Sequence, residues 1–460
     1  MIVVPNPLQF LQSLSISVGM AFATSCFTMV SGIVNAAGIL VLPAIATSTL
    51  IALVVAHAIG RLAKRFPSSL GIRTYIKSAF GNTTSLFFVF LYLLMICLIS
   101  GVEANMYATI VQYVIPSLET RLIILGIFMV VIAMNVFGYE FSKNVQVAMV
   151  VLMLSGVLSL SLFGIGHGGL SSVVEQQITS QQLVSSPAAI ISAFFLFVGF
   201  EWVTSVQPSS RGAAAQLPWV LLASITLLGC VYLTFSLAAV VNFSHSEWMS
   251  TDKPQMLLAK KLWGEAGVSI MLVVSTCAVL TAFNAGVLGA ARLLYGLARE
   301  GVLPRLFSTT ARFSGAPVSA IAATTAVSLC SALLAYALQE TYFLGSLAAI
   351  IICICYCGLL GASLVLHRRN TDRLKVRFSL AQVIEFCALL LMVALLATLV
   401  SQDYGLRHTG IVLGTVATLL LLAILANRHV NPKTFTSAPW HHQSPSFNPN
   451  DERCPTTKGK

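Results

Sequence analysis

Long apolar segments alternate with short polar connections along nearly the whole chain. Twelve of them hold about 20 residues, which is enough to cross a hydrocarbon layer about 30 Å thick. They lie at 14–34, 37–60, 84–114, 121–138, 144–166, 187–206, 217–241, 266–291, 317–338, 343–366, 379–400 and 408–426. These segments are continuously apolar and lack the alternation of a membrane β-strand. The pattern therefore predicts an all-α protein with about twelve transmembrane helices.

The polar connections are far more basic on one side of this arrangement than on the other. One set holds Arg61, Lys64, Arg65, Arg73, Lys77, Lys143, Arg211, Arg292, Arg299, Arg305, Arg312, Arg368, Arg369, Arg373, Lys375 and Arg377. The other set holds only Arg121, Lys253, Lys260, Lys261 and Arg407. Since Lys and Arg are retained on the cytoplasmic side, the bias predicts cytoplasmic N- and C-termini.

Composition narrows the class further. With 57% hydrophobic residues, 9% charged residues and a mean hydropathy of +0.88, the chain is not a soluble globule. Topology accounts for the net charge of +11, so no nucleic-acid partner is expected. Residues 1–13 carry no charge and lack the basic region of a signal peptide, which predicts a short N-terminal segment. Residues 427–460 are rich in Pro, Ser, Asn and His and predict a disordered cytoplasmic tail. A bacterial cytoplasmic membrane is the expected location.

Two apolar segments are interrupted by short glycine-centred sequences. These are Val30-Ser31-Gly32-Ile33 in the first segment and Phe197-Val198-Gly199-Phe200-Glu201 in the sixth. A helix that breaks at membrane depth frees backbone N–H and C=O groups, which lipid does not tolerate unless they line a cavity. The interruptions predict a transporter's binding site, although Gly and Ser also serve close helix packing.

Few charged groups stand within the apolar segments, and each is costly there. They are Glu103 in the third segment, Glu201 in the sixth and Glu385 near the start of the eleventh. No aspartate-rich metal cluster or His-Glu-x-x-His pair accompanies them, so the protein is expected to be neither an enzyme nor a metal or cofactor protein. A carboxylate at membrane depth can instead gain and lose a proton during transport, which is our hypothesis for Glu201.

Four motifs resemble the amino acid–polyamine–organocation family of permeases over nearly the whole membrane region. The first is Ser31-Gly32-Ile33, and the second is Arg65-Phe66-Pro67-Ser68 with Tyr75 and Phe80-Gly81. The third is Phe194-Phe195-x-Phe197-x-Gly199-Phe200-Glu201. The fourth and most specific is Asn284, Gly289, Arg292, Tyr295, Ala298-Arg299, Gly301 and Pro304.

The resemblance implies two inverted repeats, at about 14–166 and 187–366, and two peripheral helices within 379–426. It implies a substrate held between broken helices 1 and 6. Ser31 and Gly32 would meet its carboxylate and carbonyls of Thr28, Phe195 and Val198 its ammonium, and Ile33, Ser100, Gly199 and Asn284 would also belong to the substrate site. Phe195 and Trp202 would gate the pocket, and Glu201 would couple protons. A homodimer is compatible with this family.

One departure from the family bears on coupling. Some proton-coupled members carry a lysine in the fifth span, at a position that matches about Met153 here, and this chain has no lysine inside its spans. Exchange or a glutamate-linked proton is therefore expected. The substrate is an amino acid or a related amine, and Glu103, three residues after Ser100 on the same helix face, is a candidate pocket carboxylate. An amino-acid sensor and an exporter of an amino-acid-derived metabolite stay open as alternatives.

Overall fold

The computed structural model describes residues 7–137, 139–168, 180–206, 211–244, 247–248, 251–311, 314–369, 380–400 and 405–429, and these ranges contain helices and no strand. The α-helices are α1 Pro7–Ala21, α2 Ser25–Ala37, α3 Val41–Arg65, α4 Ile72–Phe80, α5 Asn82–Val114, α6 Thr120–Val136, α7 Tyr139–Gly168, α9 Ser180–Phe194, α10 Arg211–Asn242, α12 Pro254–Arg299, α13 Val318–Leu338, α14 Thr341–Arg368, α15 Leu380–Val400 and α16 Gly405–His429. Four short 3-10 helices join them: η1 Gly38–Leu40, η2 Phe195–Phe197, η3 Phe200–Ser205 and η4 Arg305–Ser308.

The predicted all-α membrane class is confirmed. Ten described segments are long and apolar enough to cross a membrane, with α2, η1 and α3 counted together, and α6 is a shorter apolar helix. The count of twelve spans stays a prediction. The predicted start of the first span, residue 14, lies inside α1, which begins at Pro7, where the fixed φ of proline suits a first helical position. The predicted tail lies outside the described residues from residue 430 onward.

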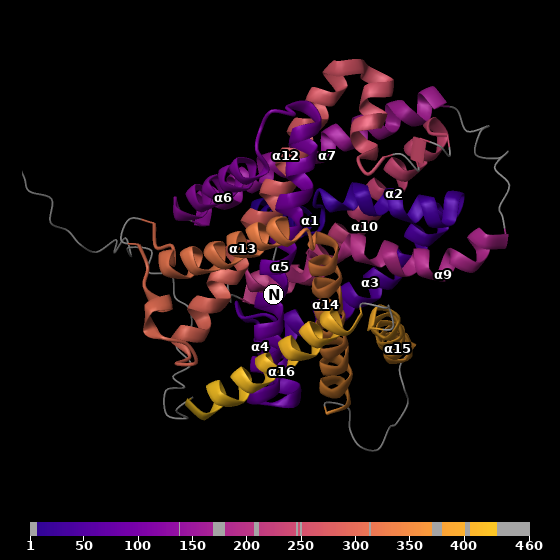
Figure 1. The fold of residues 1–460 in the computed structure, drawn as a ribbon. Coiled ribbons are helices and arrows are strands. Elements are labelled where there is room, and N and C mark those ends of the chain that lie inside the picture. Colours follow the sequence, from indigo (N-terminus) through magenta and orange to yellow (C-terminus); the bar gives the residue numbers. More distant parts are fainter. Residues whose placement is uncertain are drawn as a thin grey trace, which may run out of the picture.

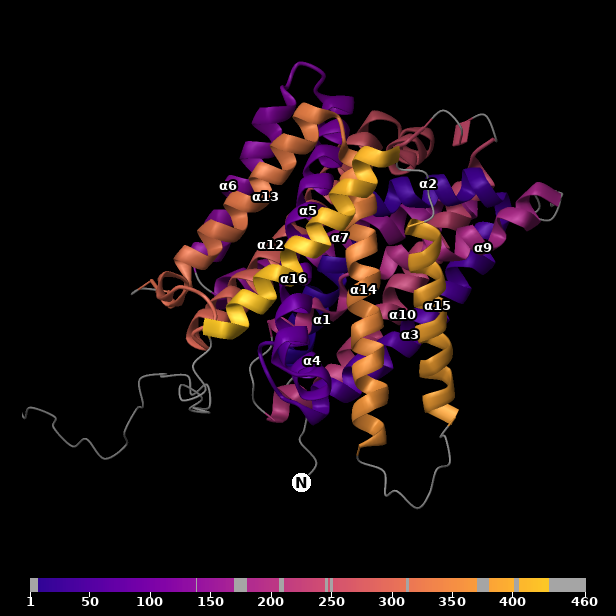
Figure 2. The same cartoon turned by 60° about the horizontal axis from the view of Figure 1, so that its bottom comes forward.

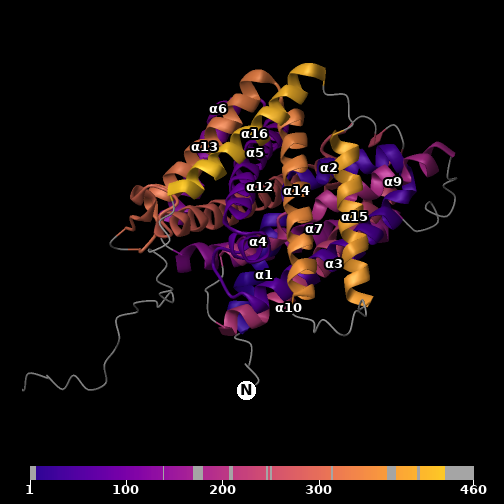
Figure 3. The ribbon, with the colours of Figure 1, turned by 90° about the horizontal axis from the view of Figure 1, so that it is seen from below.

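The helices surround a central group. Helices α5 and α12 lie among the others, whereas α6 and α13 run side by side along one edge (Figures 1 and 2). Helix α10 packs on α3 and α7. Helices α15 and α16 lie at the outside of the bundle, as Figure 3 shows from below. Helix α16 exposes Leu413, Leu420, Leu421, Leu422 and Leu425, as expected of a helix that faces lipid.

The first helix break lies at Phe22–Thr24, between α1 and α2. Helix α1 closes with a hydrogen bond from Phe22 N to Val18 O, and Cys26 N bonds to Ala23 O as α2 begins. The predicted break at 30–33 is wrong, since α2 runs without interruption through those residues. Gly32 is exposed, and a Cβ added to it would meet open space. A glycine is therefore not required at this position for a helix break or for a close contact.

The second break is confirmed at 195–200. Helix α9 tightens into η2, Val198 is extended, and Gly199 adopts a left-handed conformation with φ 105° before η3 begins. A Cβ on Gly199 would lie 3.0 Å from Met20 Cγ and 3.2 Å from Met20 O. The two breaks are therefore in contact, and a glycine is needed there both for its φ and for the close approach of α1.

Candidate transport site

A cavity of about 640 Å³ lies between the two breaks. Its walls come from the ends of α1 and α2, from α5, from α9 and η2, and from α12, α14 and α15. Most of the surface is apolar, with contributions from Met20, Met29, Met95, Met106, Ile191, Phe195, Phe283 and Ile352. A cavity of this volume suits a small molecule.

Glu103 is the only acidic residue among the described residues that line the cavity, and none of them is Lys, Arg or His. Its side chain is 2% exposed. Glu103 Oε2 accepts a hydrogen bond of 3.1 Å from Ser25 N at the start of α2. In this way the carboxylate satisfies a backbone N–H that the first break frees, and it lies at the positive end of the α2 dipole.

Tyr232 of α10 joins the carbonyl groups of the two breaks. Its hydroxyl donates to Leu196 O at 2.8 Å and lies 3.3 Å from Ala21 O. Ser17 donates to Phe200 O at 2.7 Å. Side chains of the protein therefore satisfy several carbonyls that the breaks release, which is how a broken helix is tolerated at membrane depth.

Glu201 lies behind the second break and is not among the residues that line the cavity. It is 2% exposed, and each of its oxygens accepts one tyrosine hydroxyl. Tyr92 Oη of α5 donates to Oε1 at 2.8 Å, and Tyr356 Oη of α14 donates to Oε2 at 2.6 Å. The neighbouring Trp202 donates from Nε1 to Ala285 O at 2.9 Å. Glu201 thus connects η3 to α5 and α14.

Asn284 belongs to a buried polar network and does not line the cavity. Its Oδ1 accepts hydrogen bonds from Asn135 Nδ2 at 3.0 Å and from Ser142 Oγ at 2.8 Å. Its Nδ2 donates to Gln146 Oε1 at 2.8 Å. The network fastens α12 to α6 and α7. Glu385 also has a partner inside the protein, because it forms an ion pair of 2.5 Å with Arg61.

The residues of the first span that were predicted to bind the substrate lie away from the cavity. Thr28 and Ser31 donate from α2 to the carbonyls of Asp252 at 2.9 Å and Thr251 at 3.0 Å, in the connection before α12. Ile33 is buried in the core and Gly32 is exposed. One face of α2 therefore holds this connection.

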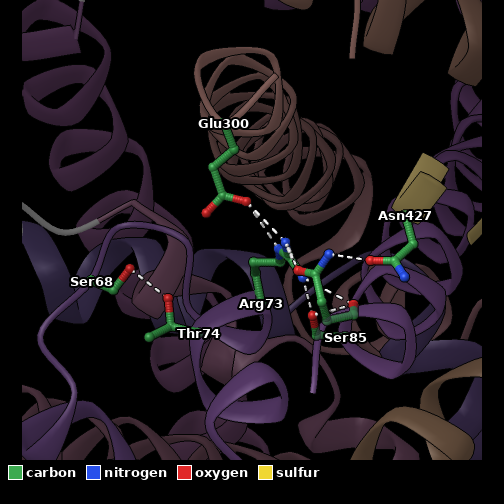
Figure 4. Close-up of polar contacts among 7 residues, drawn as sticks. Ser68, Arg73, Thr74, Ser85, Glu300 and Asn427 are labelled. Carbon is green, nitrogen blue, oxygen red and sulfur yellow. Dashed lines mark hydrogen bonds and ion pairs between the residues drawn. The ribbon is translucent and has the colours of Figure 1, made fainter. Parts of the chain in front are cut away.

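A second polar cluster joins the connections at the opposite end of the bundle (Figure 4). The Arg73 guanidinium on α4 is 1% exposed and forms an ion pair of 3.0 Å with Glu300, just after α12. It also donates to Asn82 Oδ1 at 2.6 Å and to Ser85 Oγ. Asn82 in turn donates to Asn427 of α16 at 2.5 Å. The cluster fastens α4, α5, α16 and the end of α12 together.

Several basic connections meet at this face. Arg65 donates to Leu366 O at 2.9 Å, and Arg369 donates to Ser78 O at 3.2 Å. The connections at 61–77, 299–305 and 366–369 therefore share one face, as the distribution of Lys and Arg predicts.

Of the residues predicted for the site, Ser100, Glu103, Phe195, Val198 and Gly199 line the cavity. Thr28, Ser31, Gly32, Ile33, Glu201, Trp202 and Asn284 do not. Sequence reasoning missed Met20, Ala21, Ser25 and Cys26, and it missed Tyr232 behind them. The local sequence Ala23-Thr24-Ser25-Cys26 carries no glycine or proline that would signal the first break. Among the described residues, no group of three or more His, Cys, Asp or Glu is placed to hold a metal.

A cavity between two broken helices inside a helical bundle is typical of membrane transporters. The chain belongs to the amino acid permease family, whose model matches residues 8–420. The gamma-aminobutyric acid permease of Bacillus subtilis is 22% identical over 90% of this chain and 91% of its own. The low-affinity putrescine importer PlaP of Escherichia coli K12 is 22% identical over 54% of this chain and 57% of its own.

Solved structures agree on the fold. A manganese transporter of Eremococcus coleocola superposes with a TM-score of 0.59 at 14% identity, over 92% of this chain and 94% of that one. At this identity the likeness concerns the fold alone. The family and its permease relatives support transport of amino acids or amines by a multi-pass membrane protein, and permeases are not enzymes.

The contact between the breaks predicts that Gly199→Ala is destabilising. The alanine would occupy a left-handed backbone conformation and press its Cβ on Met20, at a cost of about 1–3 kcal/mol. Gly32→Ala is the matched control, since open space surrounds Gly32 in a helix where alanine is the better residue. Thermal unfolding of the purified variants should show a lower midpoint for Gly199→Ala alone. Equal midpoints would contradict the position of the contact.

Proposed function

We propose that the protein is a secondary active transporter that moves amino acids or related amines by alternating access, through exchange or in a proton-linked cycle. The cavity between the two helix breaks carries this proposal. Broken helices in contact can separate or close around a ligand with small rotations of the surrounding bundle, because few backbone hydrogen bonds cross the breaks. The contacts of α2 at one end and of Arg73 at the other are then candidate gates.

The proposed topology places the basic face on the cytoplasmic side of a bacterial inner membrane, with both termini inside. The two five-helix inverted repeats and the peripheral pair are part of this proposal. In the proton-linked form, Glu201 takes up and releases the proton. The titratable groups that face it are Tyr92, Tyr356 and Cys355.

Counterflow in proteoliposomes tests the function. Vesicles that hold the purified full-length protein are loaded with one unlabelled amino acid or amine, and uptake of the same labelled compound is followed. Uptake that requires an internal partner supports exchange, and uptake into unloaded vesicles under an imposed proton gradient supports proton-linked transport. Import is compared with export by supplying the labelled compound first only outside the vesicles and then only inside them. Saturable binding of one ligand per protein without any uptake would reject transport in favour of a sensor.

A further inference from the structure

The cavity carries information about the substrate class, and this inference rests on the proposed transport function. In a site for an α-amino acid, N–H groups at a helix start meet the carboxylate. Here the protein's own carboxylate already occupies that place, because Glu103 Oε2 accepts the hydrogen bond of Ser25 N at 3.1 Å. The Thr24 backbone interacts with the same carboxylate. A substrate carboxylate would therefore compete with Glu103 for the start of α2.

The rest of the described lining offers no cationic side chain in place of those N–H groups. None of the described lining residues is Lys, Arg or His. The hydroxyls of Ser100, Ser346 and Thr398 each donate to a carbonyl of their own helix, at 2.7, 3.1 and 2.8 Å. A substrate carboxylate would lose its hydration in a largely apolar cavity without a charged partner, which is strongly unfavourable.

Glu103 itself lacks a counter-ion. Its Oε1 is buried and accepts no hydrogen bond from any described residue. No described Lys, Arg or His side chain forms an ion pair with Glu103. A buried carboxylate of this kind leaves an acceptor position for a cation that the protein does not supply.

We propose that the cavity selects a primary monoamine, with one ammonium group, an apolar body and no carboxylate, and that Glu103 is the counter-ion of the ammonium. The apolar body lies among Met20, Met29, Met95 and the rings of Phe195 and Phe283, where flexible thioethers adapt to different shapes. A diamine fits less well, because the cavity offers one carboxylate and the second ammonium would be unpaired.

Matched pairs of compounds test this proposal in the full-length protein. Phenylalanine is compared with 2-phenylethylamine, leucine with 3-methylbutylamine, and putrescine is added as a diamine. Each compound is assayed by counterflow in proteoliposomes and by thermal stabilisation of the protein in detergent. Vesicles without protein measure the leak of each amine through lipid. We expect each monoamine to exchange and to stabilise the protein at concentrations at least tenfold below those of its parent amino acid and of putrescine.

Two variants assign the selectivity to Glu103. Glu103→Gln is expected to weaken the response to monoamines at least tenfold. The same change at Glu265, an exposed residue that does not line the cavity, is expected to leave it unchanged. The comparison of matched compounds in the unmodified protein keeps the proposal falsifiable if Glu103→Gln does not fold.

The outcomes separate the proposed substrate class from the proposed transport function. Amino acids that exchange as well as their amines, or a Glu103→Gln variant with full amine transport, would overturn the substrate class and leave transport standing. Stabilisation by monoamines alone, without exchange of any compound, would reject transport and retain the amine site. Neither stabilisation nor exchange by monoamines would overturn the amine site.

Discussion

Replacing Glu201 with glutamine is expected to slow transport about tenfold or more and to remove the pH dependence that this side chain contributes. Both carboxylate oxygens accept tyrosine hydroxyls in a fully buried setting. An amide offers only one oxygen, so either Tyr92 or Tyr356 loses its acceptor, at a cost of about 1–3 kcal/mol. About 1.4 kcal/mol corresponds to a factor of ten in a rate.

Exchange rates of Glu201→Gln and the unmodified protein across pH 5.5–8.5 provide the measurement. Tyr356→Phe is the matched control, because it removes one donor and keeps the carboxylate. We expect this control to lose less activity and to keep the shape of its pH profile. An unchanged rate and an unchanged pH profile in Glu201→Gln would reject a role for Glu201 in coupling.

The hydrophobic pattern was sufficient to predict the fold class. The apolar segments are long and continuous, which is compatible only with a helical membrane protein. The second break was also predictable. Gly199 stands inside an apolar helix next to a carboxylate, and its left-handed φ is the conformation that such a glycine suggests.

The first break was not predictable from local sequence, because Phe22, Ala23 and Thr24 are all compatible with a helix. Distant residues make the break possible: Glu103 of α5 accepts the freed N–H of Ser25, and Tyr232 of α10 lies at the freed carbonyl of Ala21. A glycine and a serine at 31–32 gave the stronger local signal. That signal was misleading, since Ser31 bonds to the connection before α12 instead.

The same limit applies to buried polar residues in general. Asn284 and Glu103 both stand inside apolar segments, yet one is paired by three side chains and the other lines the cavity. Helix rotation decides between these outcomes, and it is set by packing against other helices. The spacing of Ser100 and Glu103 helped because it needs only one helix, and both residues line the cavity.

Replacing Arg73 with alanine is expected to destabilise the protein more than Gly199→Ala does. The guanidinium is 1% exposed and joins Glu300, Asn82 and Ser85, so its removal takes a donor from the Glu300 carboxylate and from Asn82 Oδ1. Burial lowers the pKa of Arg73 and Glu300 raises it, but a guanidinium stays charged in proteins. Breaking a buried ion pair from one side costs about 3–5 kcal/mol. Because Glu300 is 20% exposed, we expect about 3 kcal/mol.

A double-mutant cycle separates the ion pair from the rest of the cluster. Thermal unfolding is measured for Arg73→Ala, Glu300→Gln and the double variant. We expect the double variant to lose less stability than the two single changes added together, since each removes the same contact. Arg73→Lys should be intermediate, because an ammonium keeps the charge but cannot reach Glu300, Asn82 and Ser85 in one planar fork. Strictly additive losses would show that Arg73 and Glu300 act independently. The cluster would then not hold α4 to the end of α12, and it would be lost as a candidate gate.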